Sequence, residues 1–183
     1  MKKMLVWALG SVLFMGCDND KATESKMETS VAAAGSESTT QPAVFADAKY
    51  ADIARKGVAA LSSGDIDGWM NDYADNAVYL WNNGDSLVGK AAIGAYWKNR
   101  RTTVMDSISF SNQIWLPITV NQPQSVEQAG TWVLGWYMVK AKYKTGKTMQ
   151  QWIHTDLHFD ASDKIDRTIQ YLDRVPINAA MSK

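Results

Sequence analysis

Hydrophobic residues along the chain follow two periods, one typical of helices and one typical of strands. Residues 46–62 carry them three and four positions apart, which places them on one face of a helix. Gly64 is a C-cap signal after this helix, and Asp65 is a candidate N-cap for a short helix over residues 66–73. A third helix is predicted over residues 89–101.

The remaining hydrophobic positions predict β-strands, because they alternate or cluster between turn signals. Residues 77–81 and 86–88 predict a short strand pair around the turn at 82–85. Four further strands are expected, over residues 107–120, 130–143, 148–160 and 165–173. Helices followed by long consecutive strands predict an α+β domain, in which the N-terminal helices pack on one face of a curved antiparallel sheet.

The first 16 residues have the pattern of a signal peptide. Lys2 and Lys3 precede an apolar run over residues 4–15, which is too short for the roughly 20 helical residues that span a bilayer. The run ends in Gly16-Cys17, which resembles the lipobox of bacterial lipoproteins. This resemblance implies acyl chains on Cys17 that anchor the protein to a membrane of the cell envelope, at about 0.8 kcal/mol per buried CH₂. A plain secretory signal with a chance cysteine is the alternative, and the choice of membrane stays open.

Residues 17–44 differ in composition from the rest of the chain. They are rich in Ser, Thr, Ala, Glu and Gly and contain no aromatic residue. Such a segment buries too little apolar surface to fold, so we expect a flexible tether. The folded domain is therefore expected over residues 45–178, followed by a short tail over 179–183.

Charge and cysteine content argue against a nucleic-acid partner and an internal disulfide. The chain has 19 basic and 19 acidic residues and no basic patch, which argues against a nucleic-acid partner. Its single cysteine allows no intramolecular disulfide. The sequence suggests no cofactor.

Three ordered motifs are similar to the nuclear transport factor 2-like superfamily, which includes ketosteroid isomerases, SnoaL-like polyketide cyclases and scytalone dehydratases. They lie at residues 64–79, 88–93 and 159–165, and Asp163 stands where the family usually has glycine. The resemblance implies a cone-shaped sheet whose mouth is closed by helices, with an apolar pocket inside. It implies no particular activity, because one fold hosts many functions.

The resemblance also allows the isomerase mechanism to be checked residue by residue. Gly57 stands at the position of the oxyanion-hole tyrosine, Trp81 at that of the catalytic base, and Thr155 at that of the oxyanion-hole aspartate. Glycine has no side-chain donor, and tryptophan cannot take a proton from carbon. The isomerase mechanism is therefore not expected.

The remaining candidate site residues lie on the strand at 148–160, where successive side chains point to opposite faces. The resemblance turns Thr155 into the pocket and leaves His154, Asp156 and His158 on the outer face. A His154–Asp156 acid–base pair in the pocket would require a one-residue slip of register. These three side chains are spaced by about 6.5–7 Å per step, too far apart to gather around one metal ion. We therefore expect no metal site.

We expect an envelope-anchored domain that binds a small apolar or aromatic molecule. The expected pocket residues are Tyr73, Tyr79, Trp81, Trp97, Trp136 and Thr155. One alternative is a SnoaL-like isomerase, cyclase or dehydratase that uses His154 and Asp156 for proton transfer. Another is a structural dimerisation module, since the strand at 130–143 is apolar on both faces, which also favours a homodimer.

Overall fold

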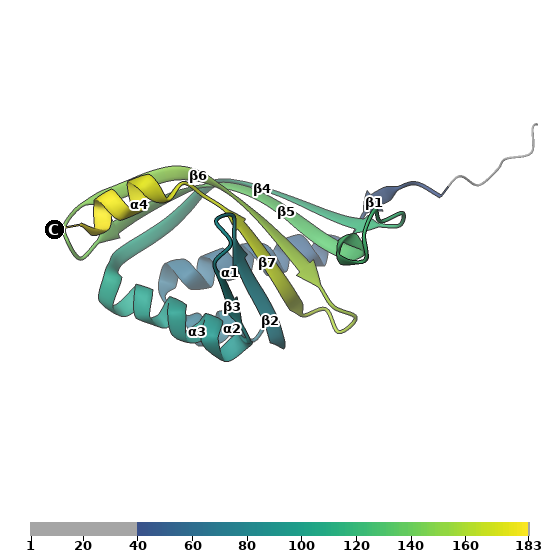
Figure 1. Ribbon diagram of the computed structural model, residues 1–183, viewed down its shortest axis with the longest axis horizontal. Helices are drawn as coiled ribbons and strands as arrows, with labels where there is room; N and C mark the ends of the chain where they lie inside the picture. Colours follow the sequence, from purple (N-terminus) through teal and green to yellow (C-terminus); the bar gives the residue numbers. More distant parts are fainter. Residues whose placement is uncertain (1–39, 183) are drawn as a thin grey trace, which may run out of the picture. The chain divides into compact units, whose positions relative to one another are not determined.

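The computed structural model describes residues 40–182, which form one α+β domain (Figure 1). Cys17 and most of the expected tether lie outside the described residues. Between residues 40 and 182, no helix has the length and apolar character needed to cross a membrane.

Capping residues define the first two helices, at the positions that the sequence predicts. Helix α1 covers Ala48–Ser63 and ends at Gly64, whose φ of 88° is left-handed and whose N–H bonds back to Ala60. Helix α2 covers only Ile66–Met70, and the carboxylate of its N-cap Asp65 accepts the N–H of Gly68. The other helices are α3 (Lys90–Asn99), the π-helix η1 (Arg100–Val104), the 3₁₀ turn η2 (Val126–Gln128) and α4 (Arg174–Met181).

In the described part of the chain, seven strands form one sheet in the order β1-β4-β5-β6-β7-β2-β3. Their bounds are β1 Ala43–Phe45, β2 Tyr73–Trp81, β3 Ser86–Val88, β4 Met105–Val120, β5 Gly130–Tyr143, β6 Thr148–Phe159 and β7 Ile165–Tyr171. All neighbours pair antiparallel except β2 and β7, which are parallel. The predicted α+β class with a curved sheet and helices is confirmed. The parallel pairing of β2 with β7 is not part of the prediction, which is of an antiparallel sheet.

Two elements differ from the sequence pattern. Strand β1 begins at Ala43, inside the expected tether, and pairs with the far end of β4. Strand β7 ends at Tyr171, two residues before the expected end of the last strand, and helix α4 follows and extends into the expected tail. Pro176 does not prevent this helix, because it falls in the first turn, where no intrahelical bond needs its N–H.

Bulges in β4 accompany the curvature of the sheet. The pairing of β4 with β5 shifts between Met105 and Ser107 and again between Ser111 and Ile114, where Asn112 has a φ of 52°. Bulges bend and twist a strand locally. As a result, β4, β5 and β6 arch over α1, α2 and α3 (Figure 1).

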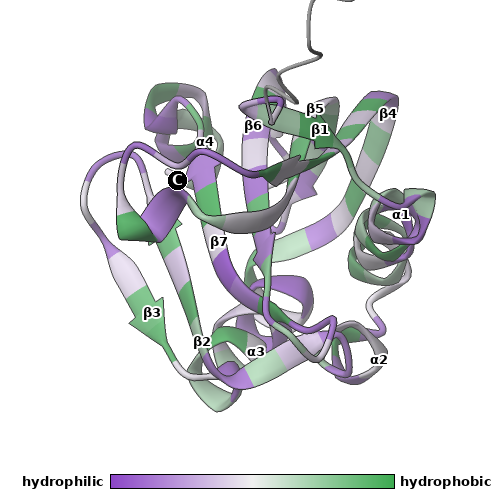
Figure 2. Ribbon diagram, turned by 90° about the vertical axis from the view of Figure 1, so that its right-hand side faces the viewer, coloured by the Kyte–Doolittle hydropathy of each residue, from purple (hydrophilic) through white to green (hydrophobic). Residues whose placement is uncertain are grey.

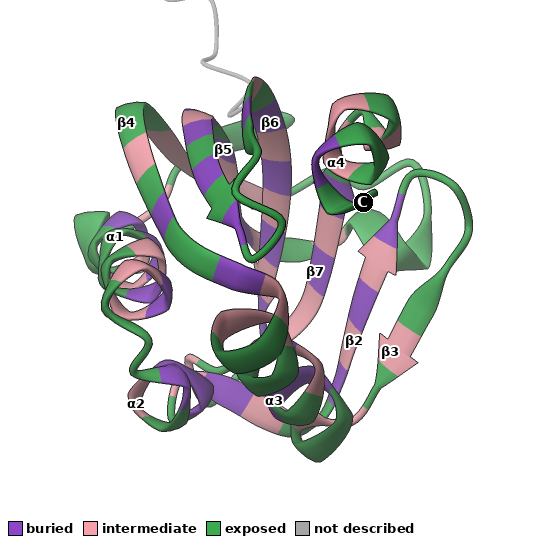
Figure 3. Ribbon diagram, turned by 90° about the vertical axis from the view of Figure 1, so that its left-hand side faces the viewer, coloured by how far each residue is buried: buried purple, intermediate pink, exposed green. Residues whose placement is uncertain are grey.

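The concave side of the sheet and the helices enclose the core. Two opposite end-on views show that α1 and α4 lie at opposite sides of the domain, with α2 and α3 below β4, β5 and β6 (Figures 2 and 3). Buried and partly exposed residues alternate along β6, so that Ile153, Thr155, Leu157 and Phe159 face inward. This is the face that the resemblance assigned to the pocket.

Candidate functional site

A cavity of about 170 Å³ lies between the concave side of the sheet and helices α1, α3 and α4. Its walls are mostly aromatic and aliphatic. The aromatic lining residues are Trp69, Tyr73, Tyr79, Trp81, Tyr96, Trp97, Phe110, Trp115, Tyr137 and Tyr143. The predicted pocket residues Tyr73, Tyr79, Trp81, Trp97 and Thr155 are all part of this lining.

Edge-to-face aromatic contacts hold the helical side of the cavity together. The Trp69 ring lies 5.4 Å from Tyr73 and 5.8 Å from Trp97, both in T-shaped geometry. Gly57 makes room for this cluster, since a Cβ atom there would stand 2.8 Å from Trp69 Nε1. The position that the isomerases give to a catalytic tyrosine thus serves packing in this chain.

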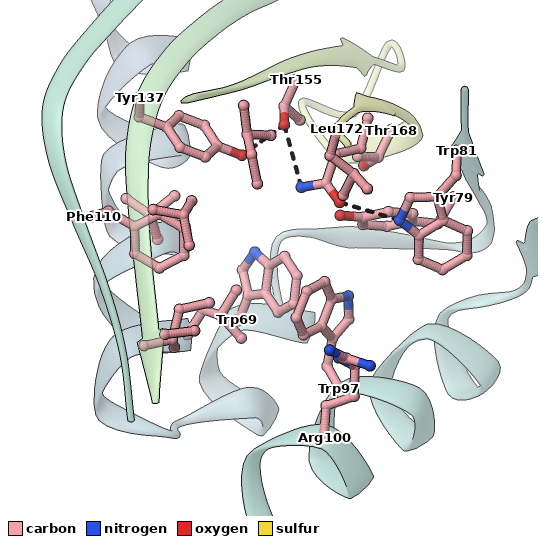
Figure 4. Close-up of a pocket in the computed structure, with 18 of the residues that line it drawn as sticks. Trp69, Tyr79, Trp81, Trp97, Arg100, Phe110, Tyr137, Thr155, Thr168 and Leu172 are labelled. Atoms are coloured by element: carbon pink, nitrogen blue, oxygen red, sulfur yellow. Dashed lines mark hydrogen bonds between the residues drawn. The ribbon is translucent and has the colours of Figure 1, made fainter. Parts of the chain in front are cut away.

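A chain of hydrogen bonds crosses the sheet side of the cavity (Figure 4). Trp81 Nε1 donates to Gln170 Oε1 at 3.1 Å, and Gln170 Nε2 donates to Thr155 Oγ1 at 3.5 Å. The hydroxyls of Thr155 and Tyr137 bond to each other at 2.6 Å. Because these buried groups satisfy one another, they orient the wall without the cost of lone polar atoms.

The tyrosine hydroxyls at the cavity are poor acid–base groups near neutral pH. Burial raises the pKa of Tyr73, Tyr79 and Tyr137 above the ordinary value. Among the described residues that line the cavity, Arg100 and Arg174 carry charge, and none is a carboxylate or a histidine. The lining therefore offers hydrogen bonds and apolar surface rather than a proton acceptor.

Trp136 is a correction to the predicted pocket. Strands β5 and β6 pair without a shift from Thr131 to Lys142, which fixes the face of every residue between them. Trp136 therefore points outward, where its ring stacks 4.7 Å from that of His154. Tyr137, the next residue, takes the inward position.

His154 and Asp156 lie together, but on the outer face of β6. His154 Nε2 is 2.7 Å from Asp156 Oδ1, and neither residue lines the cavity. The slip of register that would turn Asp156 inward does not occur. Burial raises the pKa of Asp156, and the neighbouring His154 opposes this shift.

The third member of the His-x-Asp-x-His pattern has different partners. His158 Nδ1 hydrogen-bonds to Asp166, and its Nε2 hydrogen-bonds to the backbone oxygen of Ala129 at 3.0 Å. Within residues 40–182, no three His, Cys, Asp or Glu side chains gather as metal ligands would. The pattern thus forms two separate pairs.

Sequence reasoning missed several residues of the cavity wall. Tyr137 could have been found from strand alternation, because it has the parity opposite to Trp136. Gln170 and Thr168 gave no signal of their own, and they reach the cavity because β7 lies between β6 and β2. Arg100 and Arg174 come from helix ends whose position depends on the tertiary fold.

Comparison with known proteins supports the fold. A family model described as a SnoaL-like domain matches residues 54–168. No curated protein matches the sequence significantly.

Solved structures with the same architecture include three from bacteria. A proposed polyketide cyclase from Xanthomonas campestris pv. campestris shares 17% identity at a TM-score of 0.59, over 73% of this chain and 97% of the other. A proposed isomerase from Bacillus subtilis shares 19% identity at a TM-score of 0.57, over 72% and 91%. An LEH-like epoxide hydrolase from M. tuberculosis shares 14% identity at a TM-score of 0.57, over 73% and 84%.

At such identities the likeness establishes the fold alone. The family model, in contrast, spans more than half of the chain and includes most of the elements that form the cavity, with α4 outside the match. The protein therefore belongs to the SnoaL-like domain family.

Proposed function

We propose that the protein is an envelope-anchored domain that binds a small apolar or aromatic molecule in the cavity. The observation that carries this proposal is an aromatic lining whose sheet-side polar groups bond to one another and which, over residues 40–182, contains no carboxylate or histidine. The volume of about 170 Å³ suits a single ring, because an apolar cavity of about 150 Å³ holds benzene.

The alternative of a SnoaL-like isomerase, cyclase or dehydratase finds less support. Proton transfer requires a base within hydrogen-bond reach of the substrate. His154 and Asp156 lie on the opposite side of β6 from the cavity, so a substrate inside would not touch them. We therefore expect His154→Gln and Asp156→Asn to leave ligand binding unchanged.

Calorimetry and thermal shift with single-ring compounds such as toluene and cyclohexanol test the binding proposal. A ligand at 100 times its dissociation constant stabilises the native state by about 2.7 kcal/mol. Ala54→Leu on the cavity side of α1 is expected to abolish the shift, because the added carbons fill the cavity. Ala59→Leu on the exposed side of the same helix is the matched control. A wild-type protein that responds to none of the compounds would contradict the proposal.

We also propose that acyl chains on Cys17 anchor the protein. Support comes from Lys2, Lys3, the short apolar run and the Gly16-Cys17 junction. In cells that are fed labelled palmitate, the wild-type protein should carry the label and fractionate with membranes, whereas Cys17→Ser should do neither. An unlabelled wild-type protein would remove the anchor from the proposal and leave the cavity unaffected.

A further inference from the structure

Arg100 brings a positive charge to the cavity without a counter-ion. In the described part of the chain, no carboxylate lies within ion-pair distance of its guanidinium. Its contacts include Met181 Sδ at 3.9 Å and the face of the Tyr96 ring, whose centroid is 5.7 Å away, and it also lies close enough to Tyr143 to oppose the rise in the pKa of that phenol. Arg174, the other lining arginine, is by contrast paired with Asp85 at 3.0 Å. Arg100 is therefore the lining residue that can attract an anion.

Trp97 supplies a second, independent observation. Only 7% of this residue is exposed, and its Nε1 is buried without a hydrogen-bond partner among the described residues. An unsatisfied buried donor costs about 1–3 kcal/mol. Because Trp97 lines the cavity, an acceptor atom on a bound molecule could satisfy its N–H.

The two groups belong to one place in the fold. Trp97 is in the last turn of α3, and Arg100 follows it, with its backbone N–H bonded to the Trp97 carbonyl. Figure 4 shows both side chains rising from this helix towards the aromatic cavity. A positive charge at a helix C-terminus is favourable in itself, but that role does not explain the unpartnered indole N–H.

Building on the proposed function, we propose that the ligand is a small aromatic or alicyclic carboxylate. Its carboxylate accepts hydrogen bonds from the Arg100 guanidinium and from Trp97 Nε1, and its ring occupies the apolar cavity. The planar fork of arginine matches a carboxylate in two parallel hydrogen bonds. The described lining holds no acidic side chain that would compete for Arg100 or repel the ligand.

Calorimetry with the full chain compares phenylacetate with phenylacetamide, which has the same shape and no charge. The wild-type protein is expected to bind the acid at least about tenfold more tightly than the amide at neutral pH. Arg100→Gln should remove this preference and still bind the amide. Arg100→Lys should keep part of it, since the charge remains while the fork is lost.

Control variants separate this charge effect from others. Lys98→Gln removes the same charge from the same helix, but Lys98 pairs with Asp67 and does not line the cavity, so the preference should persist. Trp97→Phe removes the indole N–H together with part of the ring surface. Loss of surface affects both ligands, whereas loss of the N–H affects the carboxylate alone, so this variant should weaken phenylacetate several-fold more than toluene. Circular dichroism melts establish that each variant is folded.

The outcomes distinguish the two proposals. Equal affinity of the wild-type protein for acid and amide, or an unchanged preference in Arg100→Gln, would refute the proposal that the ligand is a carboxylate. Neither result would contradict the proposal that the cavity binds a small molecule. Failure of toluene, amide and acid alike to bind would overturn the proposed function and the carboxylate with it.

Discussion

Asp163 shows what a single departure from the family pattern does in this chain. The residue lies in the turn between β6 and β7 with a φ of 60°, a left-handed conformation that glycine, the residue implied here by the family resemblance, adopts without strain. Aspartate tolerates this region better than most residues. Its carboxylate accepts hydrogen bonds from Tyr50 Oη at 2.6 Å and Lys49 Nζ at 2.7 Å, which ties α1 to this turn.

We predict that Asp163→Asn lowers stability in a pH-dependent way. The Lys49 ammonium and the Tyr50 hydroxyl hold the pKa of Asp163 below its ordinary value. The stabilisation is therefore present above the ordinary aspartate pKa of about 3.9 and is lost as the pH falls through the lower native value. Urea midpoints of variant and wild type should differ at neutral pH and converge in acid. Asp75→Asn should show a much smaller trend, because Asp75 is fully exposed and its ion pair with Lys90 is long, at 3.8 Å.

Gly57 and Gly94 both lie in helices, but a Cβ atom added at each would meet a different kind of side chain. The neighbour of Gly57 is a rigid ring, and that of Gly94 is a flexible chain. Alanine in place of glycine within a helix gains about 1 kcal/mol of propensity. At Gly57 the new Cβ would meet the buried Trp69 ring at 2.8 Å, and we expect Gly57→Ala to lower the free energy of unfolding by about 1–2 kcal/mol in total. At Gly94 the neighbour is Met70 Cγ at 3.2 Å, and a flexible thioether can move aside. Gly94→Ala should thus be neutral or stabilising in urea denaturation, and equal effects at both sites would refute the packing argument.

Helix α4 contributes to the cavity wall and is held by contacts at both of its ends. Ile177 and Met181 line the cavity, and Thr145 Oγ1 bonds to the backbone oxygen of Ala180 near the end of the helix. Asp173 caps its beginning by accepting the N–H of Val175 at 2.8 Å. This cap gives Asp173, two residues after the end of β7, a structural role.

We predict that Asp173→Ala loosens α4 selectively. Loss of an N-cap costs about 1 kcal/mol, so amide hydrogen exchange should speed up over residues 174–181 while β5 and β6 keep their protection. Asp173→Asn retains a capping oxygen and should exchange like the wild type. Unchanged exchange in the alanine variant would show that α4 is held by its other contacts alone.

At the scale of the whole molecule, the outer face of the sheet carries an aromatic row. His154 on β6 stacks between Trp136 on β5 and Tyr171 on β7, with ring centroids 4.7 and 5.5 Å apart. Trp152 beside them is 50% exposed. Contiguous exposed apolar surface of this kind favours covering by another protein.

We therefore expect the protein to form a homodimer through this face. A two-fold dimer would bring the same row from each copy together. In sedimentation equilibrium the wild-type protein should behave as a dimer, and Trp152→Glu should shift it towards the monomer. Val126→Glu provides the control, because Val126 is 90% exposed in η2. A monomeric wild-type protein would remove the dimer from consideration.

Local patterns in the sequence were enough to locate most elements and their faces. The caps at Gly64 and Asp65 depend on backbone geometry within one turn, so they are readable from neighbouring residues. Strand alternation separated Thr155 from His154, because successive side chains of a strand must point to opposite faces, and the family resemblance indicated which face is inward. These features follow from short-range sterics and hydrogen bonding.

The tertiary structure decided the features that join distant segments. Trp136 and Tyr137 are both aromatic, and only the pairing of β5 with β6 determines which of them faces the cavity. The parallel contact of β2 with β7 and the link from Trp81 to Gln170 likewise join residues about ninety positions apart. Whether an arginine has a counter-ion is also a long-range matter, because a carboxylate from any part of the chain could reach it. Composition and periodicity thus determined an aromatic-rich α+β domain, whereas the packing of remote elements determined which side chains meet inside it.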